Sequence, residues 1–155
     1  MTSITRKLEF DAGHRIPDHR SQCWNLHGHR YVLEITLEGE VIAAPGQSDN
    51  GMVMDFSEIK SIARKHIVDQ WDHAFLVFRG DTAVIDFLES LENHKTVIVD
   101  SIPTAENLAH LAFDTLAPQY ARQYARQYAR QFGGSLRLSR IRLYETPNCW
   151  VDVLA

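Results

Sequence analysis

The sequence feature that most constrains the fold is a period-two alternation of apolar and polar residues. It is clearest from Tyr31 to Glu38, where every second side chain is apolar, and it recurs more weakly from Thr2 to Phe10. Successive side chains of a strand point to opposite faces of a sheet, so this pattern is typical of a strand with one buried face. Two further apolar runs, from Leu136 to Tyr144 and from Trp150 to Leu154, flank a Thr-Pro-Asn turn and predict a hairpin.

Two other segments have the spacing of amphipathic helices. The first follows Asp55 and Glu58, which are placed to form a capping box. The second begins after Thr104 as its N-cap, and its apolar residues form one stripe along the helix. Between these two helices, Ala83 to Leu91 is expected to be a short helix and Lys95 to Val99 a short strand.

A four-residue repeat, Gln-Tyr-Ala-Arg, occurs three times between Gln119 and Arg130. Residues four apart lie one turn apart on a helix, so the repeat predicts an extended helix end after Pro118. The repeat places an aromatic ridge and a row of arginines on that helix: Tyr120, Tyr124, Tyr128 and Phe132, beside Arg122, Arg126 and Arg130. The alternative is that these rows form a binding surface for a partner or a phosphate group.

This order of elements predicts an α+β fold, with a four-stranded antiparallel sheet and two main helices packed on one face. A length of 155 residues fits a single domain, residues 1–155, and a content of 45% hydrophobic residues is ordinary for a globular protein. A net charge of −4 gives no electrostatic reason to bind nucleic acid. The sequence contains no apolar signal core and no membrane-spanning run, so we expect a cytoplasmic location and no membrane association.

Three histidines point to a metal centre. His27 and His29 are two residues apart at the start of a predicted strand, so their imidazoles lie on one side of it. His14 ends the first predicted strand and meets them if the two strands are neighbours. Three neutral imidazoles suit zinc and leave a fourth position open for water or substrate, as in catalytic zinc sites. Taken alone, the His-x-His pair would more often be a pair of surface or packing histidines.

Cys23 lies four residues before His27. As a thiolate ligand it would close the metal site and make the zinc structural. As a thiol beside the metal, within reach of its positive charge, it would instead be a usable base. The other cysteine, Cys149, lies in the predicted hairpin and is distant from the histidines in sequence. Two cysteines are too few for a disulfide framework, so both are expected to be reduced.

Three more polar residues have two readings each. Asp72 and His73 are adjacent and form an acid–base pair only if the fold turns both side chains toward one point; otherwise they are surface residues. Glu145 ends a predicted strand, where its carboxylate could accept two N–H groups from a guanidine-like ring. It could equally be a solvated turn residue.

Taken in chain order, motifs along nearly the whole sequence resemble those of the 6-pyruvoyl-tetrahydropterin synthase family, which includes the 6-carboxytetrahydropterin synthases. These segments carry the resemblance: Phe10-x-Ala12-x-His14, Cys23-x-x-x-His27-Gly28-His29, Met52 to Phe56, Asp72-His73, Pro103 to Ala109, and Tyr144-Glu145-Thr146. The cysteine spacing is the form seen in the bacterial 6-carboxytetrahydropterin synthases of queuosine biosynthesis. Residues 78–100 and 118–132 are not part of the core family pattern and are interpreted as family-variable insertions.

The resemblance implies a tunnelling-type fold and a role for each site residue. Three residues would bind Zn²⁺: His14, His27 and His29. Four would be catalytic: Cys23 as the proton-abstracting base, Asp72 and His73 as the proton relay on the other face of the substrate, and Glu145, which would also anchor the pterin ring. Two more would line the substrate pocket: Thr104 and Glu106.

The implied enzyme is a carbon–carbon lyase with a small pterin triphosphate as its substrate. It would convert 7,8-dihydroneopterin 3'-triphosphate to 6-carboxy-5,6,7,8-tetrahydropterin, acetaldehyde and triphosphate, as a homo-oligomer built from trimers, either a trimer or a hexamer. One alternative is 6-pyruvoyl-tetrahydropterin synthase, which eliminates triphosphate without cleaving the side chain. Others are a zinc hydrolase with Glu106 or Asp55 as its base, and a metal-binding module without enzymatic activity.

Overall fold

Two long antiparallel strands form the centre of the molecule. The computed structural model describes the backbone of residues 1–155 and every side chain except that of Arg130. Strand β1 (Thr2–His14) pairs with β2 (His27–Gly39) along their full length, from Thr2 opposite Gly39 to His14 opposite His27. The apolar positions of the predicted alternation in β2 are fully buried, which confirms that one face of this strand packs against the core.

The sheet has six strands in the order β4-β3-β1-β2-β5-β6. The predicted hairpin is present as β5 (Leu136–Thr146) and β6 (Cys149–Leu154), and β5 pairs antiparallel with β2. The expectation of four antiparallel strands was wrong, because β3 (Ala74–Phe78) and β4 (Thr96–Val99) extend the sheet and run parallel to the end of β1. All five residues of β3 are apolar and at least half-buried, so this strand lacks the alternation that marks the others.

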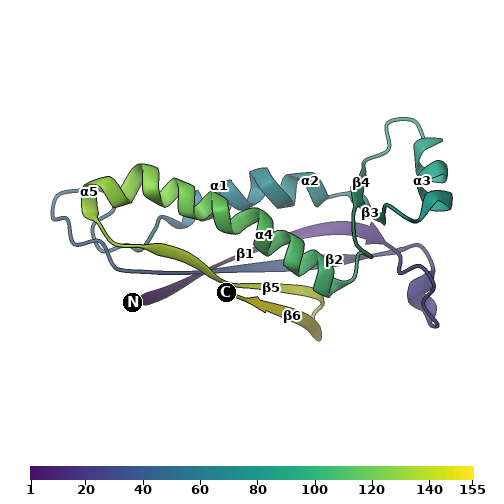
Figure 1. Ribbon diagram of the computed structural model, residues 1–155, viewed down its shortest axis with the longest axis horizontal. Coiled ribbons are helices and arrows are strands. Elements are labelled where there is room, and N and C mark those ends of the chain that lie inside the picture. Colours follow the sequence, from purple (N-terminus) through teal and green to yellow (C-terminus); the bar gives the residue numbers. More distant parts are fainter.

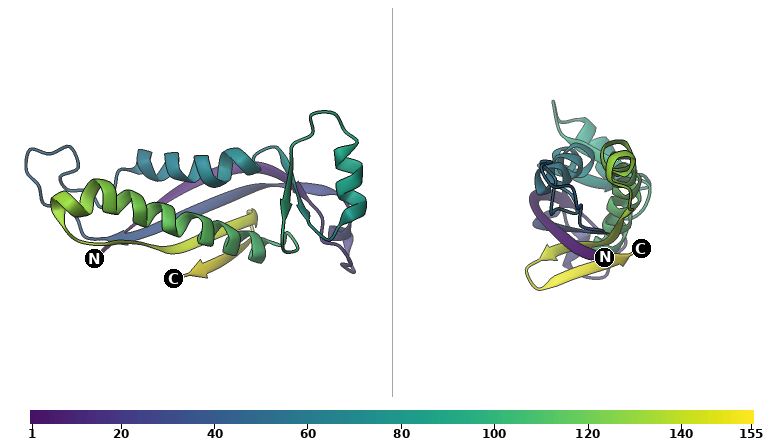
Figure 2. Two further views of the ribbon diagram at one scale, coloured as in Figure 1. Left: turned by 45° about the horizontal axis from the view of Figure 1, so that its top comes forward. Right: turned by 90° about the vertical axis from the view of Figure 1, so that its left-hand side faces the viewer.

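Two long helical segments cover the same face of the sheet (Figures 1 and 2), as expected. The first consists of α1 (Phe56–Ala63), the π-helical turn η2 (Arg64–Val68) and α2 (Asp69–Trp71). The second consists of α4 (Ala105–Tyr124), the π-helical turn η3 (Ala125–Ala129) and α5 (Arg130–Phe132). The core lies between this helical layer and the long strands.

The predicted N-caps are present, but the predicted capping box is not formed as expected. The carboxylate of Asp55 accepts a hydrogen bond from the Ser57 amide at 2.6 Å and caps α1. The carboxylate of Glu58 accepts instead from the side-chain amide of Gln127 at 2.6 Å and from the hydroxyl of Tyr128 at 2.9 Å. Glu58 therefore connects α1 to the repeat rather than completing its own helix cap.

The Gln-Tyr-Ala-Arg repeat is helical, as predicted, and its tyrosines belong to the core. Tyr120, Tyr124 and Tyr128 are all at most 4% exposed. The Tyr120 hydroxyl donates to the main-chain oxygen of Ile59 at 2.9 Å, so the aromatic ridge ties α4 to α1. The tyrosines are thus unavailable as a partner-binding surface, and the predicted arginine row includes Arg130, whose side chain lies outside the described part of the chain.

The segment between the two long helical segments forms a small lobe at one end of the molecule (Figure 1). It contains the predicted short helix, α3 (Thr82–Glu89), and the predicted short strand, β4. A separate apolar cluster of Val77, Val84 and Leu88 holds α3 against β3. The loop from β1 to β2, which includes the short 3-10 helix η1 (Gln22–Trp24), lies at the same end. Among the described helices, none is both long and apolar enough to span a membrane.

Candidate functional site

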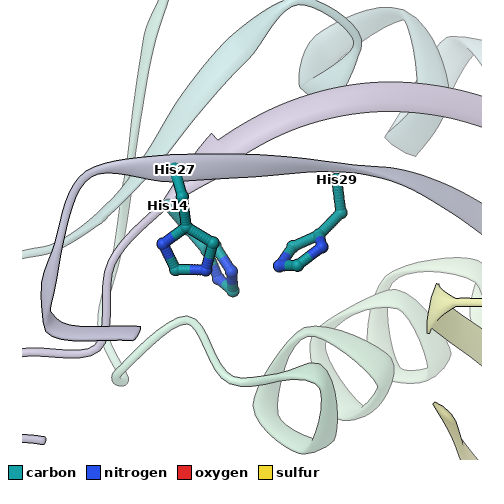
Figure 3. Close-up of side chains that lie close together, drawn as sticks. All are labelled: His14, His27 and His29. Carbon is teal, nitrogen blue, oxygen red and sulfur yellow. The ribbon is translucent and has the colours of Figure 1, made fainter. Parts of the chain in front are cut away.

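Three imidazoles converge where β1 ends and β2 begins. His14 pairs with His27 across the ladder and Ala12 with His29, so the strand register alone brings the three rings to one place. The ring centroids are 4.6 to 5.1 Å apart, and one ring nitrogen from each residue lies within 4.8 Å of the others. Figure 3 shows the three rings turned toward a common point. The sequence prediction that these histidines meet is confirmed.

Hydrogen bonds to the main chain orient two of these rings. The Nδ1 atom of His14 lies 2.7 Å from the carbonyl oxygen of Pro103, and that of His27 lies 2.7 Å from the carbonyl oxygen of Asn25. A carbonyl only accepts, so each Nδ1 carries the proton and each Nε2 presents its lone pair. Within the described part of the chain, the buried Nε2 atoms of all three histidines have no hydrogen-bond partner.

Burial favours the neutral form of His14 and of His29. It lowers the pKa of His14 from 6.5 to about 4, and it also lowers the pKa of His29. A metal ion needs deprotonated imidazoles. Three converging imidazole nitrogens, each without a protein partner, fit a divalent metal ion held by three ligands. The cluster can therefore hold a metal ion, and its oriented Nδ1–H groups match the outer contacts that metal-binding histidines usually make.

The carboxylate of Glu145 lies beside this cluster. One of its oxygens is 3.5 Å from Nε2 of His14 and 3.9 Å from Nε2 of His29. Glu145 is near the end of β5, directly beyond the residues of that strand that pair with β2. Its side chain is 26% exposed, so a ligand that enters the site can contact it.

A cavity of about 310 Å³ adjoins the cluster and is lined by most of the residues that the sequence singled out. Its lining includes these six residues: His14, Cys23, Thr104, Glu106, Glu145 and Cys149. Cys23 is half-buried and its thiol is free. Cys149, although distant from the histidines in sequence, also lines this cavity, because the β5–β6 turn places it opposite Thr146, next to Glu145 in the chain.

The first turn of α4 faces this cavity. The hydroxyl of Thr104 accepts a hydrogen bond from the Asn107 amide at 3.3 Å and caps the helix, as its sequence position predicted. The side-chain amide of Asn107 donates to the Ile102 carbonyl at 2.8 Å, which fixes the approach to the helix. Glu106, in the first turn, is exposed and lines the cavity. Thr104 thus has an observed structural role in addition to its position in the cavity wall.

Asp72 and His73 form the expected pair, but His73 lines a different cavity from Cys23. The Asp72 carboxylate is 3.0 Å from Nδ1 of His73, and its other oxygen accepts from the Asp11 amide at 2.9 Å. That amide bond is the largest cause of the lowered pKa of Asp72. His73 has a φ of 58°, a left-handed conformation that is uncommon for residues other than glycine and often found at functional sites.

The cavity beside His73 has a volume of about 510 Å³ and is also lined by Asp11, Arg30 and His94. Arg30 donates two hydrogen bonds of 3.0 Å to the Asp11 carboxylate, which places an ion pair next to the dyad. Cys23 is absent from the lining of this cavity and His73 is absent from that of the Cys23 cavity. Within one chain, the base and the proton relay implied by the family resemblance therefore face different spaces.

Two site contacts had no signal in the sequence. Pro103 and Asn25 orient His14 and His27 through their main-chain carbonyls, which every residue possesses. No residue type is required for such a contact, so only the folded backbone reveals it. Cys149 could have been found from the sequence, since a tight turn after Glu145 returns the chain to the same end of the sheet.

Comparisons with known proteins agree with this geometry. The family model described as 6-pyruvoyl tetrahydropterin synthase matches residues 3–155. A 6-carboxy-5,6,7,8-tetrahydropterin synthase of Rickettsia bellii is 39% identical over 99% of this chain and 100% of its own length. The protein of the same name from Haemophilus influenzae is 32% identical over 98% of both chains.

A solved structure described as Caenorhabditis elegans 6-pyruvoyl tetrahydropterin synthase has the same fold, with a TM-score of 0.61. It is 22% identical and covers 99% of this chain and 95% of its own. Together with the match over almost the whole sequence, these results show that the chain belongs to the 6-pyruvoyl tetrahydropterin synthase family.

Proposed function

We propose that this protein is a zinc-dependent 6-carboxytetrahydropterin synthase of queuosine biosynthesis. It would convert 7,8-dihydroneopterin 3'-triphosphate and one water molecule to 6-carboxy-5,6,7,8-tetrahydropterin, acetaldehyde and triphosphate, which makes it a carbon–carbon lyase. One observation carries the proposal: three partnerless histidine nitrogens converge beside the Cys23 cavity. This arrangement occurs in a chain that is 39% identical to a relative with that name.

His14, His27 and His29 would hold the zinc ion through their Nε2 atoms. When bound, zinc supplies Lewis acidity to hydroxyl groups of the substrate side chain. The Pro103 and Asn25 carbonyls fix two of the ligands before the metal arrives, so little imidazole reorientation accompanies binding.

The remaining cavity residues would divide binding and proton transfer between them. Cys23, free and half-buried, would remove a carbon-bound proton from the substrate. The Glu145 carboxylate would accept hydrogen bonds from the pterin N–H groups and so hold the ring beside the metal centre. Thr104 and Glu106 would contact the substrate from the first turn of α4, since both line the same cavity.

Asp72 and His73 would return a proton on the other face of the substrate, and this role requires a second subunit. In one chain His73 and Cys23 line different cavities. In the described chain, β3 pairs only with residues 12–14 of β1. Most of the β1 edge that faces away from β2 is therefore unpaired. Unpaired edges invite pairing with another chain. We therefore propose a homo-oligomer built from trimers, a trimer or a hexamer, in which neighbouring subunits complete each site.

Two further properties belong to the same proposal. Residues 1–155 would be one catalytic domain, with residues 78–100 and 118–132 as family-variable insertions. A cytoplasmic location would keep Cys23 and Cys149 reduced, which is consistent with both thiols being free.

Product analysis tests the proposed reaction directly. Purified protein with zinc is incubated with 7,8-dihydroneopterin triphosphate, and the products are identified by mass spectrometry. We expect acetaldehyde and the carboxypterin in equal amounts, and neither product from the His27→Ala variant. A pyruvoyl product without acetaldehyde would instead identify the other activity of this family. Turnover that survives alkylation of Cys23 would contradict its role as the base and favour a hydrolase.

One of the two candidate bases of a zinc hydrolase is already engaged elsewhere in the fold. Asp55 is occupied as the cap of α1, which leaves Glu106 as the candidate base that lines the cavity.

The proposed assembly can be tested by light scattering, which should give a mass that is a multiple of three chains. A fully active monomer would contradict a site shared between subunits.

A further inference from the structure

The loop that carries Cys23 is tied together at its base. This loop connects β1 to β2, and the Ile16 amide donates a hydrogen bond of 2.9 Å to the carbonyl oxygen of Cys23. The guanidinium of Arg15 lies over the ring of Trp24, with its central carbon 4.6 Å from the ring centroid. Arg15 and Ile16 at the start of the loop therefore hold Cys23 and Trp24 at its far side.

The same guanidinium is anchored to the lobe formed by residues 78–100. Its Nε and Nη2 atoms donate hydrogen bonds of 2.6 and 2.7 Å to the two carboxylate oxygens of Asp81. The two side chains are only 17% and 5% exposed. A bidentate arginine–carboxylate pair fixes both distance and orientation, and a pair shielded from water holds its geometry more firmly than an exposed one.

Asp81 is itself held rigidly. Its amide donates to the Phe78 carbonyl at 2.8 Å, and its carbonyl accepts from the Ile85 amide at 3.1 Å. It occupies the N-cap position of α3, yet its side chain forms no capping hydrogen bond with that helix. The carboxylate that would ordinarily cap α3 is thus directed to Arg15 instead.

We infer that Arg15 and Asp81 are positioning residues that set the location of the Cys23 thiol relative to the metal centre, with Trp24 as the contact that transmits their constraint. The 78–100 lobe then serves the active site by supplying the anchor at Asp81. This inference rests on the proposed function only in taking Cys23 as the base. The restraint of the loop that carries Cys23 does not depend on that role, and it can be measured without substrate.

Asp81→Asn is the most direct test, because it keeps the shape of the side chain and removes its charge. The zinc-loaded variant should retain wild-type zinc content, and kcat should fall by about 10- to 100-fold, the size expected when a reacting group is misplaced by about 1 Å. KM should change less than kcat. Without substrate, hydrogen–deuterium exchange of residues 16–26 should rise, and iodoacetamide should alkylate Cys23 faster, as followed by peptide mass spectrometry.

Slower turnover and faster alkylation at wild-type zinc content distinguish loss of positioning from general damage to the protein. Arg79→Ala is the matched control, since Arg79 forms a 2.6 Å ion pair with Asp100 in the same lobe, with both side chains largely exposed. It should leave the zinc content, kcat, KM, loop exchange and Cys23 alkylation unchanged. Arg15→Lys keeps the charge but loses the planar fork, and should behave like Asp81→Asn.

Trp24→Ala provides a second route if Asp81→Asn fails to fold, because Trp24 is 44% exposed and its removal leaves the buried ion pair intact. It should raise exchange and alkylation of the loop in the same direction. The inference is overturned if folded Asp81→Asn or Trp24→Ala matches Arg79→Ala in loop exchange and Cys23 alkylation. If wild-type protein has no synthase activity but the loop measurements respond as expected, the proposed function fails and the restraint stands.

Discussion

Gly28 separates two of the three candidate metal ligands, and its replacement by alanine should weaken metal binding. A Cβ atom at Gly28 would lie 2.9 Å from the main-chain oxygen of Ala12 on the neighbouring strand. The φ of Gly28 lies outside the left-handed region, so alanine can adopt its backbone conformation and the contact alone is the obstacle. The obstructing atom belongs to the backbone, which cannot move aside as a flexible side chain can.

The size of the effect follows from that distance. An ordinary van der Waals contact begins at 3.4 Å, so β1 and β2 must separate locally by 3.4 − 2.9 = 0.5 Å. Bonds from zinc to imidazole nitrogen are about 2.0 to 2.1 Å long and vary by only about 0.2 Å. A displacement of this size between His14 on one strand and His27 and His29 on the other exceeds that tolerance. We expect zinc affinity to fall by about 10- to 100-fold, as for other changes that disturb ligand orientation.

Zinc affinity would be measured by competition with a chromophoric chelator, and stability by urea denaturation at fixed protein concentration. Gly28→Ala should also cost about 1 to 3 kcal/mol of unfolding free energy through overpacking. The control is Gly46→Ala, where φ is 86° and nothing lies within 4 Å of the added Cβ. It should cost about 1 to 2 kcal/mol through backbone strain and leave zinc affinity unchanged. Wild-type zinc affinity in Gly28→Ala would refute this reasoning.

Three other predictions follow from single groups. Burial lowers the pKa of His14 from 6.5 to about 4, so the unfolded state binds the proton more tightly than the folded state. As the pH falls from 6.5 to 4, metal-free protein should therefore lose up to about 3 kcal/mol of unfolding free energy. Urea midpoints should show a flatter pH dependence in His14→Asn, and equal slopes would contradict this cause. Cys23→Ala should keep its zinc by elemental analysis and lose at least about 10²-fold in turnover, well beyond the effect of Cys149→Ala; loss of zinc would instead make Cys23 a ligand. Tyr128→Phe removes the hydroxyl that donates to Glu58 and should lower the unfolding free energy by about 1 to 2 kcal/mol without changing zinc content; an unchanged urea midpoint would show that the bond adds nothing.

Local sequence patterns were sufficient for the elements that have one clear periodicity. The alternation in β2 and the turn residues between β5 and β6 predicted those strands, and the four-residue repeat predicted the extension of α4. Each of these patterns reports the burial of one face, which is a property of the residues themselves. The alternation of apolar and polar residues did not predict β3, because all five residues of this strand are apolar and none reveals a period of two.

The candidate metal site was predictable for a similar reason. His27 and His29 occupy alternate positions of one strand, and His14 ends the strand that precedes it, so pairing of neighbouring strands brings the three rings together. The sequence also identified Cys23, Thr104, Glu106 and Glu145 as candidates through the family resemblance. The structure places all four on one cavity beside the histidines.

Tertiary structure alone decided which cavity each acid–base group faces. The adjacency of Asp72 and His73 did not reveal that His73 faces a different cavity from Cys23 within one chain. Nor did the sequence link Arg15 to Asp81, two residues 66 positions apart whose side chains meet because β3 pairs in parallel with the end of β1. A sequence pattern records which face of an element is buried, whereas the distance between two side chains depends on how separate elements pack, and that is fixed only in the folded chain.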